Sequence, residues 1–195
     1  MQIIPAILSV DKFEVFELLR KIRESGKFER VQIDFIDGEY ANNKTIRPVE
    51  VDLLPFLPLM FDAHLMVTEN NVLAWSKTAE KVGFDRVIVQ TESISNPGDF
   101  SGLALDIHSP VELLIPYLHN LDVVVLMAVE PGFSGQKFND GVIEKVRQLH
   151  KLRRYSNYRY KICVDGGVLQ EHVPILSEAG ADEVTVGIRR ALDWS

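Results

Sequence analysis

Ile162-Cys163-Val164-Asp165-Gly166-Gly167 is a short apolar stretch that ends in one carboxylate and two glycines. A carboxylate at the end of a buried strand costs several kcal/mol unless a partner or a function compensates for it. The glycines let the backbone approach a ligand that a Cβ atom would exclude. Two earlier apolar runs also end in polar residues, Val31-Gln32-Ile33-Asp34 and Phe61-Asp62-Ala63-His64-Leu65-Met66. Polar ends on several strands are typical of an active site in a parallel β/α fold.

Strand-like and helix-like segments alternate along the rest of the chain. The predicted strands cover residues 3–8, 31–34, 59–66, 87–90, 103–107, 123–127, 160–165 and 183–187. The predicted helices cover residues 11–25, 71–82, 109–118, 141–154 and 169–179. Asp11 is the expected N-cap of the first helix, and Gly83 and Gly180 are expected to end two others. The apolar face predicted for the first helix consists of Phe13, Phe16, Leu18, Leu19 and Ile22.

Strands that alternate with helices predict a parallel sheet. With eight strands, closure into a TIM (β/α)8 barrel leaves no free edge, and a doubly wound open sheet is the alternative. Residues 93–101 are too short and too rich in helix breakers for a proper helix, and only eight residues follow Gly187. We therefore predict a single-domain barrel over residues 1–195, with its fourth helix missing or vestigial and its eighth helix shortened.

The composition limits the classes of partner and the location. The 195 residues are 46% hydrophobic, which suits one large core, and the formal net charge of −7 argues against nucleic acid or an anionic membrane as partner. No apolar run approaches the roughly 20 residues of a membrane span, and the N-terminal residues lack the basic region of a signal peptide. Cys163 is the only cysteine, which excludes an intrachain disulfide and indicates a reducing, cytoplasmic location.

Three of the polar strand ends can meet in the mouth of such a barrel, where the chemistry of this fold takes place. Gln32 and Asp34 share a face of their strand, and Asp62 shares a face with His64 on the next. If Asp34, His64 and Asp165 face one another, the two carboxylates can transfer protons on opposite faces of one carbon. The same side chains can bind a divalent cation. The alternative is that the aspartates are turn or cap residues and that the histidine is structural.

Glycine-rich turns follow the last three predicted strands. Gly132 and Gly135 lie after the sixth strand, Gly166 and Gly167 after the seventh, and Gly187 after the eighth. Backbone N–H groups bind phosphate in many barrels of this kind, usually after the seventh and eighth strands. The pattern predicts a phosphate site, with ordinary loop geometry as the alternative.

Five motifs resemble those of the ribulose-phosphate 3-epimerase family, and their order and spacing match over residues 3–187. They are Pro5-Ala6-Ile7-Leu8-Ser9, Asp34-Phe35-Ile36-Asp37-Gly38, His64-Leu65-Met66-Val67, Met127-Ala128-Val129-Glu130-Pro131-Gly132-Phe133-Ser134-Gly135-Gln136 and Val164-Asp165-Gly166-Gly167. The fourth motif is the most specific. The resemblance implies a TIM barrel that interconverts D-ribulose 5-phosphate and D-xylulose 5-phosphate through an enediolate.

The resemblance also implies roles for individual residues. Asp34 and Asp165 match the acid and base that act on opposite faces of C3. The family's metal ligands are two aspartates and two histidines, of which Asp34, His64 and Asp165 are kept here. They imply one divalent ion, such as zinc, iron, manganese or magnesium. The implied substrate- and phosphate-binding residues are Ser9, Met66, Met127, Gly132, Phe133, Ser134, Gly135, Gly166, Gly167, Gly187 and Ile188.

Several strand ends depart from the family pattern. Gln32 replaces the other metal histidine and offers only a neutral amide oxygen, which suits zinc poorly and manganese or magnesium better. Ala6 replaces a serine, and Gln90 replaces a histidine. The turn after the fifth strand reads Asp106-Ile107-His108-Ser109, and Gly187-Ile188 stands where glycine and serine are usual. These changes predict an altered substrate or a weakened metal site.

The leading hypothesis is an epimerase in which Asp34 and Asp165 exchange the C3 proton of a ketose phosphate and Gln32 is a weak fourth metal ligand. The second is a non-catalytic phosphosugar-binding relative that has lost the metal. A third, a metal-free decarboxylase of the orotidine phosphate type, needs an Asp-x-Lys pair that no predicted strand end carries. A homo-oligomer formed through the thin flank near residues 93–101 is also expected.

Overall fold

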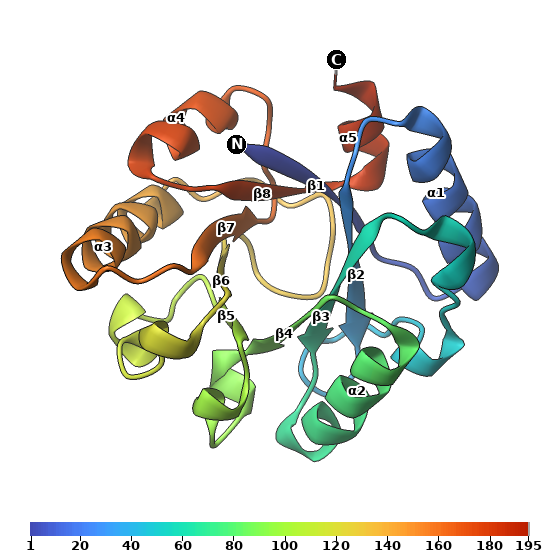
Figure 1. Ribbon diagram of the computed structural model, residues 1–195, viewed down its shortest axis with the longest axis horizontal. Helices are drawn as coiled ribbons and strands as arrows, with labels where there is room; N and C mark the ends of the chain where they lie inside the picture. The colour runs from blue at the N-terminus through green and yellow to red at the C-terminus, as the bar shows by residue number, and fades with distance from the viewer. Residues whose placement is uncertain (195) are drawn as a thin grey trace.

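A computed structural model describes residues 1–194 as a barrel of eight parallel strands surrounded by helices (Figure 1). Each strand pairs with the next along the chain, and β8 pairs with β1, so the sheet has no free edge. The TIM-barrel prediction is confirmed, and the open sheet is wrong. The strands are β1 (Gln2–Ile7), β2 (Arg30–Ile36), β3 (Met60–Met66), β4 (Arg86–Gln90), β5 (Gly102–Leu105), β6 (Val123–Met127), β7 (Lys161–Asp165) and β8 (Glu183–Gly187).

Five α-helices pack outside the strands in the described part of the chain. Asp11 caps the first by accepting a hydrogen bond from the N–H of Phe13 at 2.9 Å, and Gly83 and Gly180 end two others in the left-handed conformation, as predicted. The last helix has only six residues, which confirms the expected shortening. The helices are α1 (Lys12–Ser25), α2 (Glu69–Val82), α3 (Gly141–Ser156), α4 (His172–Ala179) and α5 (Ile188–Asp193).

Short 3₁₀ turns replace an α-helix at three of the strand connections. After β4 the chain forms only η3 and η4, so the vestigial fourth helix is confirmed. The helix predicted over residues 109–118 is wrong, because η5 and η6 take its place. Pro116 stands inside this segment, has no N–H to donate and would clash with a carbonyl of the preceding turn. The turns are η1 (Pro48–Glu50), η2 (Leu54–Phe56), η3 (Thr91–Ser93), η4 (Pro97–Asp99), η5 (Val111–Leu114) and η6 (Leu118–Asn120).

The apolar face predicted for helix α1 is correct for Leu18, Leu19 and Ile22 and wrong for the two phenylalanines. Val15, Leu19 and Ile22 are buried against the barrel and follow the spacing of one helical stripe. Phe13 is 72% exposed and Phe16 is 44% exposed, so their assignment to the buried face was wrong. The two phenylalanines lie off the stripe that the barrel covers.

The interior of the barrel divides into an apolar part and a polar part. Alternate residues of each strand point inward. Six inward residues of β4 to β7 form a hydrophobic cluster made of Ile88, Ala104, Val123, Val125, Met127 and Cys163. On β2, β3 and β8 several buried positions are polar instead, namely Gln32, Asp62, His64 and Thr185. The polar part continues to the carboxyl ends of the strands, where the candidate site lies.

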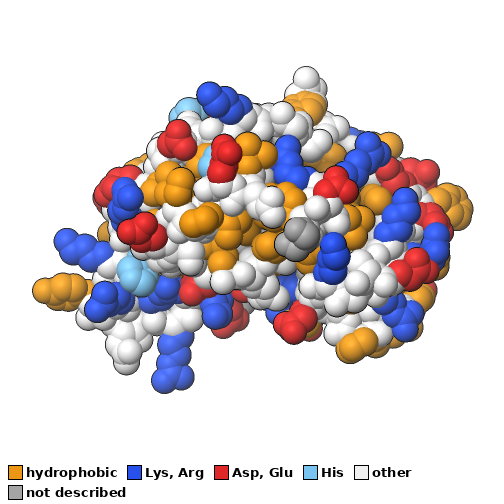
Figure 2. Space-filling model, turned by 90° about the horizontal axis from the view of Figure 1, so that it is seen from above, with side chains coloured by type: hydrophobic (Ala, Val, Ile, Leu, Met, Phe, Trp, Pro, Cys, Tyr) orange, Lys and Arg blue, Asp and Glu red, His pale blue; other side chains and the backbone are white. Residues whose placement is uncertain are grey.

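The flank predicted for self-association does not carry the exposed apolar side chains expected of it. Ile94 and Phe100 are partly buried and pack against the core. Large exposed apolar side chains lie elsewhere, for example Phe13 on α1 and Leu54 on η2. The face in Figure 2 shows hydrophobic side chains interspersed with acidic and basic ones. Oligomerisation stays a prediction. Among residues 1–194, none of the helices is long and apolar enough to cross a bilayer.

Candidate active site

Three polar side chains from β2, β3 and β7 converge at the carboxyl ends of their strands. Asp34 is the register partner of His64, and Asp165 is the last residue of β7. The Nδ1 atom of His64 lies 3.3 Å from Oδ1 of Asp34 and 3.6 Å from Oδ2 of Asp165. One potential ligand atom of each residue lies within 4.8 Å of those of the other two. The structure thus brings together the three residues predicted from separate strand ends.

These side chains line a cavity of about 410 Å³ in the mouth of the barrel. Most of the predicted substrate- and phosphate-binding residues line it too, namely Met66, Met127, Gly132, Phe133, Ser134, Gly135, Gly166, Gly167, Gly187 and Ile188. A larger hollow of about 650 Å³ lies on the outside of the barrel, and the side chains around it come from α3 and α4. The cavity in the mouth is therefore the one to which the strand ends contribute.

Ser9 is the predicted substrate-binding residue that the structure does not bring to this cavity. Its hydroxyl donates to Oε2 of Glu14 at 2.5 Å and accepts a hydrogen bond from the N–H of Asp11 at 3.0 Å. Both contacts belong to the start of α1. The β1 residue at the cavity wall is Ala6. A substrate contact for Ser9 stays a prediction.

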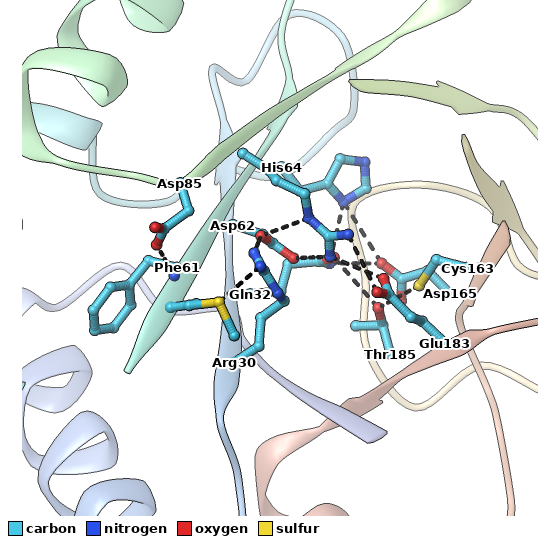
Figure 3. Close-up of polar contacts among 12 residues, drawn as sticks. Arg30, Gln32, Phe61, Asp62, His64, Asp85, Cys163, Asp165, Glu183 and Thr185 are labelled. Carbon is cyan, nitrogen blue, oxygen red and sulfur yellow. Dashed lines mark hydrogen bonds and ion pairs between the residues drawn. The ribbon is translucent and has the colours of Figure 1, made fainter. Parts of the chain in front are cut away.

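The side-chain amide of Gln32 lies among the three converging residues, and Figure 3 shows its contacts with His64 and Asp165. Its Nε2 atom lies 2.9 Å from Oδ1 of Asp34, 2.7 Å from Oδ2 of Asp165 and 3.4 Å from Nδ1 of His64. Its Oε1 atom accepts a hydrogen bond from the hydroxyl of Thr185 at 3.3 Å. Thr185 was not predicted. The signal that could have found it is alternation on β8, since Thr185 is two residues from Glu183 and faces the same interior.

The donor set of Asp34, His64 and Asp165 fits a divalent cation, because two carboxylate oxygens and an imidazole nitrogen converge on one point. Gln32 directs a nitrogen with two hydrogens toward that point, and such a group cannot bind a cation. A fourth ligand from Gln32 requires the amide to turn over, so that Oε1 faces the other three.

Burial and mutual contact shift the protonation of this group. Burial raises the pKa of the Asp34 carboxyl and Asp165 adds to that effect, although His64 and Gln32 oppose it. For His64, burial disfavours the imidazolium, but the hydrogen bonds and charges of Asp165 and Asp34 outweigh burial and raise the pKa of the ring to about 9. The two carboxylates therefore favour the charged form of the His64 ring.

A second polar layer lies nearer the amino ends of the strands, and Figure 3 labels three of its residues, Arg30, Asp62 and Glu183. Asp62, on the same face of β3 as His64, accepts two hydrogen bonds from Arg86, at 2.9 and 2.5 Å, and is also paired with Arg30. Arg86 reaches Glu183 as well, at 2.9 Å. From the alternation along β3, the sequence predicted that Asp62 shares a face with His64. The sequence could not show that two arginines hold Asp62 away from the cavity.

The glycines after β7 are required by close packing between turns. Gly166 and Gly167 have φ angles of 107° and 66°. A Cβ atom on Gly166 would lie 2.4 Å from Cγ2 of Val129, and one on Gly167 would lie 2.6 Å from the backbone nitrogen of Phe138. The turns after β6 and β7 therefore pack against each other, and together they build the cavity wall for which phosphate binding was predicted.

The connection after β2 reaches across the mouth to the ends of β5 and β6. The Tyr40 hydroxyl donates to Oδ2 of Asp106 at 2.6 Å, and the Asn43 side chain donates to the carbonyl of Gly132 at 2.6 Å. Burial raises the pKa of Asp106 to about 6; the hydrogen bond from Tyr40 opposes this rise, and the charge of Glu92 adds to it. Sequence reasoning missed Tyr40 because no local spacing rule links it to a residue 66 positions away.

Comparison with known sequences gives a consistent result over nearly the whole chain. A profile described as "Ribulose-phosphate 3 epimerase family" matches residues 2–189. A protein named ribulose-phosphate 3-epimerase from Bacillus subtilis (strain 168) is 32% identical, with 96% of this chain and 90% of that protein covered. One of the same name from Helicobacter pylori (strain ATCC 700392 / 26695) is 31% identical, with 96% and 89% covered.

Solved structures share the architecture at much lower identity. A 3-hexulose-6-phosphate synthase superimposes with a TM-score of 0.64 at 16% identity, covering 95% of this chain and 88% of its own. An orotidine 5'-phosphate decarboxylase from Pyrococcus horikoshii OT3 superimposes with a TM-score of 0.62 at 13% identity, covering 95% and 89%. Identities this low show a common fold and nothing more.

Proposed function

Because the chain belongs to the ribulose-phosphate 3-epimerase family, we propose that it inverts C3 of a ketose phosphate, with D-ribulose 5-phosphate and D-xylulose 5-phosphate as the first pair to test. The observation that carries this proposal is the convergence of Asp34, His64 and Asp165 in one cavity. The sugar chain length and the cytoplasmic location stay predictions.

Asp34 and Asp165 are the proposed acid and base. Inversion requires that a proton leaves one face of C3 and that another arrives on the opposite face. One carboxylate accepts the C3 proton and the ketose becomes an enediolate; the other carboxyl then donates a proton from the far side. Burial raises the pKa of Asp34, so this carboxyl group takes up a proton more readily than an ordinary aspartate.

The charge of the enediolate needs stabilisation close to C3. In the protein without a metal, the His64 imidazolium lies beside both carboxylates and can stabilise negative charge on the sugar oxygens. When a divalent ion is held by Asp34, His64 and Asp165, it supplies the same stabilisation as a Lewis acid. Met66 and Met127 line the cavity and exclude water from the reacting carbon.

The phosphate group is assigned to the turns after β6, β7 and β8. Gly135, Gly166 and Gly187 line that side of the cavity, and backbone N–H groups of such turns bind phosphate oxygens. Arg190 also lines the cavity and adds positive charge in a protein whose net charge is −7. The phosphate would then anchor the sugar with its C3 near the two aspartates.

Solvent isotope exchange tests the proposal. In D2O the protein should incorporate deuterium at C3 of D-ribulose 5-phosphate, measured by NMR with and without added Mn2+. Asp165→Asn should slow the exchange by about 10²–10⁴-fold, while circular dichroism and thermal unfolding show an intact fold. Asp140→Asn is the matched control, because this exposed carboxylate at the start of α3 makes no cap hydrogen bond. No exchange with any pentulose or hexulose phosphate, with manganese or zinc supplied, would overturn the proposal.

The position of the Gln32 amide favours a second candidate function, phosphosugar binding without turnover, because the amide lies where the three ligand atoms converge. Calorimetric titration with D-ribulose 5-phosphate distinguishes the two candidates. Binding without isotope exchange supports the second, and binding with exchange supports the first.

A further inference from the structure

The amide nitrogen of Gln32 lies between the two carboxylates, where a cation would lie. It lies 2.9 Å from Oδ1 of Asp34 and 2.7 Å from Oδ2 of Asp165, and it has one hydrogen for each of them. It also lies 3.4 Å from Nδ1 of His64. Gln32 is 1% exposed, so water does not compete for these contacts. In the metal-free protein, a neutral donor thus bridges two carboxylates that would otherwise face each other.

The far side of the Gln32 amide has a partner that can serve either orientation. The Thr185 hydroxyl lies 3.3 Å from Oε1 of Gln32 and 3.3 Å from Sγ of Cys163. A hydroxyl can donate to an amide oxygen, or it can rotate, donate to sulfur and accept from an amide nitrogen. Turning Gln32 over therefore leaves neither the amide nor Thr185 without a partner. The orientation of the Gln32 amide can therefore change with the presence of a cation between Asp34 and Asp165.

A second buried amide lies on the opposite side of the same imidazole. Nε2 of Gln90 is 3.0 Å from Nε2 of His64, and Oε1 of Gln90 is buried without a hydrogen-bond partner among the described residues. A histidine that binds a cation through Nδ1 carries its proton on Nε2 and needs an acceptor there. Gln90 can provide that acceptor by turning its free oxygen toward the ring. After this turn, Gln90 can accept the Nε2 proton that the cation-bound ring carries, whereas Gln32 as it lies here occupies the position of the cation.

We propose that Gln32 is a reversible competitor for the metal site: its amide nitrogen takes the place of the cation in the metal-free protein, and a divalent cation binds only when this amide turns over. The inference rests on the metal site of the proposed function but not on turnover. A competitor differs from a weak fourth ligand. Removal of the Gln32 side chain should strengthen cation binding if Gln32 is a competitor and weaken it if Gln32 is a ligand.

Cation binding by variants of residue 32 tests the proposal. Calorimetric titration of the chelator-treated full-length protein with Mn2+ alone should show Gln32→Ala binding about tenfold more tightly than wild type, because two hydrogen bonds to charged groups no longer have to be broken. Water can fill the space as the fourth ligand. Equal or weaker binding by Gln32→Ala, or no binding by any variant, would overturn the proposal. If Gln32→Ala does not fold, Gln32→Ser removes the same donor and retains a small polar group.

Gln90→Leu is the matched control, because it removes the other amide that contacts His64. It should weaken Mn2+ binding by about tenfold, as expected for the loss of a partner that orients a metal-binding histidine. Tighter Mn2+ binding by Gln32→Ala together with weaker Mn2+ binding by Gln90→Leu supports the proposal. A change of affinity in the same direction in both variants contradicts it. The readout is cation binding, so the isotope exchange experiment can fail while this result stands, and the reverse also holds.

Discussion

The barrel interior holds two polar layers, and Figure 3 labels residues of both. The lower layer, nearer the amino ends of the strands, contains Arg30, Asp62, Arg86 and Glu183, and the upper layer contains Gln32, Asp34, His64 and Asp165. The two layers differ in how their charges are balanced. In the lower layer, Asp62 and Glu183 are paired with Arg30 and Arg86, so two carboxylates meet two guanidinium groups. Arginine stays protonated at every pH at which proteins fold. The charges of the lower layer are therefore permanently compensated, and its role is to fill the barrel.

In the upper layer, Asp34 and Asp165 meet one imidazole and one neutral amide. Even with His64 protonated, one negative charge has no cationic partner within this group. Asp62 and His64 are only two residues apart on β3. Asp62 belongs to a structural ion network, whereas His64 belongs to a site that can bind a cation or a proton. Burial alone does not make the distinction, because both layers are almost inaccessible to solvent.

Removal of Asp62 should produce the largest change in stability. In Asp62→Ala, Arg30 loses its ion pair with Asp62 and Arg86 keeps only Glu183, so the free energy of unfolding should fall by about 3–5 kcal/mol in urea denaturation. Asp99→Ala, an exposed carboxylate on η4, is the control and should change stability by about 0.5 kcal/mol or less. A loss below about 1 kcal/mol for Asp62→Ala would mean that the lower layer is not a structural network.

Neutralisation of Asp34 should increase the free energy of unfolding. Asp34→Asn leaves the His64 imidazolium with one carboxylate partner, so the uncompensated charge disappears, and the chelator-treated variant should gain about 1 kcal/mol in stability at pH 7. Asp37→Asn is the comparison variant: burial acts to raise the pKa of Asp37, but the N–H groups of Tyr40 and neighbouring residues lower it to about 2. That carboxylate stabilises the fold above the unfolded pKa near 3.8, so its replacement should destabilise the protein slightly at pH 7.

A loss of stability in Asp34→Asn would contradict the comparison between the layers, because it would show that the upper layer is as well compensated as the lower one. Thermal unfolding of both variants and of wild type in one buffer at pH 7 is sufficient to decide the sign.

Asp106 should produce the smallest effect, visible only as a dependence on pH. Burial, together with the charge of Glu92, raises its pKa to about 6 from 3.8, against the hydrogen bond from Tyr40. The folded state therefore binds more protons than the unfolded state between these values, and the contribution of Asp106 to stability falls as the pH rises through this window. Because the group is partly exposed, the change should be about 1 kcal/mol or less. Urea titrations of wild type and Asp106→Asn at pH 4.5 and 7 should show a smaller decrease in the variant, and parallel decreases would refute the assignment.

Some features of the fold and the candidate site could be predicted because they depend on local periodicity. Alternation of apolar runs with amphipathic segments predicted the barrel, and breaker-rich residues 93–101 predicted the vestigial fourth helix. Asp34, His64 and Asp165 each end an apolar run, and parallel strands bring their carboxyl ends to one side. Chain order and period were sufficient to expect these residues together.

Other features could not be predicted because they depend on which side chain reaches which partner. The apolar face of α1 was predicted from the spacing of apolar residues, yet only the barrel surface decides that Val15 is covered and that Phe13 is not. The same limit applies to Asp62, whose two arginine partners come from β2 and β4. It applies also to Ser9, whose hydroxyl is bound within the start of α1.

The sequence by itself determined the closed parallel barrel, the end of the barrel where polar groups gather, and the replacement of a family histidine by Gln32. Only the tertiary structure decided which end of that amide faces Asp34 and Asp165, and which buried carboxylates have arginine partners. The physical reason is that secondary structure follows from period and local sterics, whereas the balance of charges in a low-dielectric interior depends on distances of a few ångströms between side chains from distant parts of the chain.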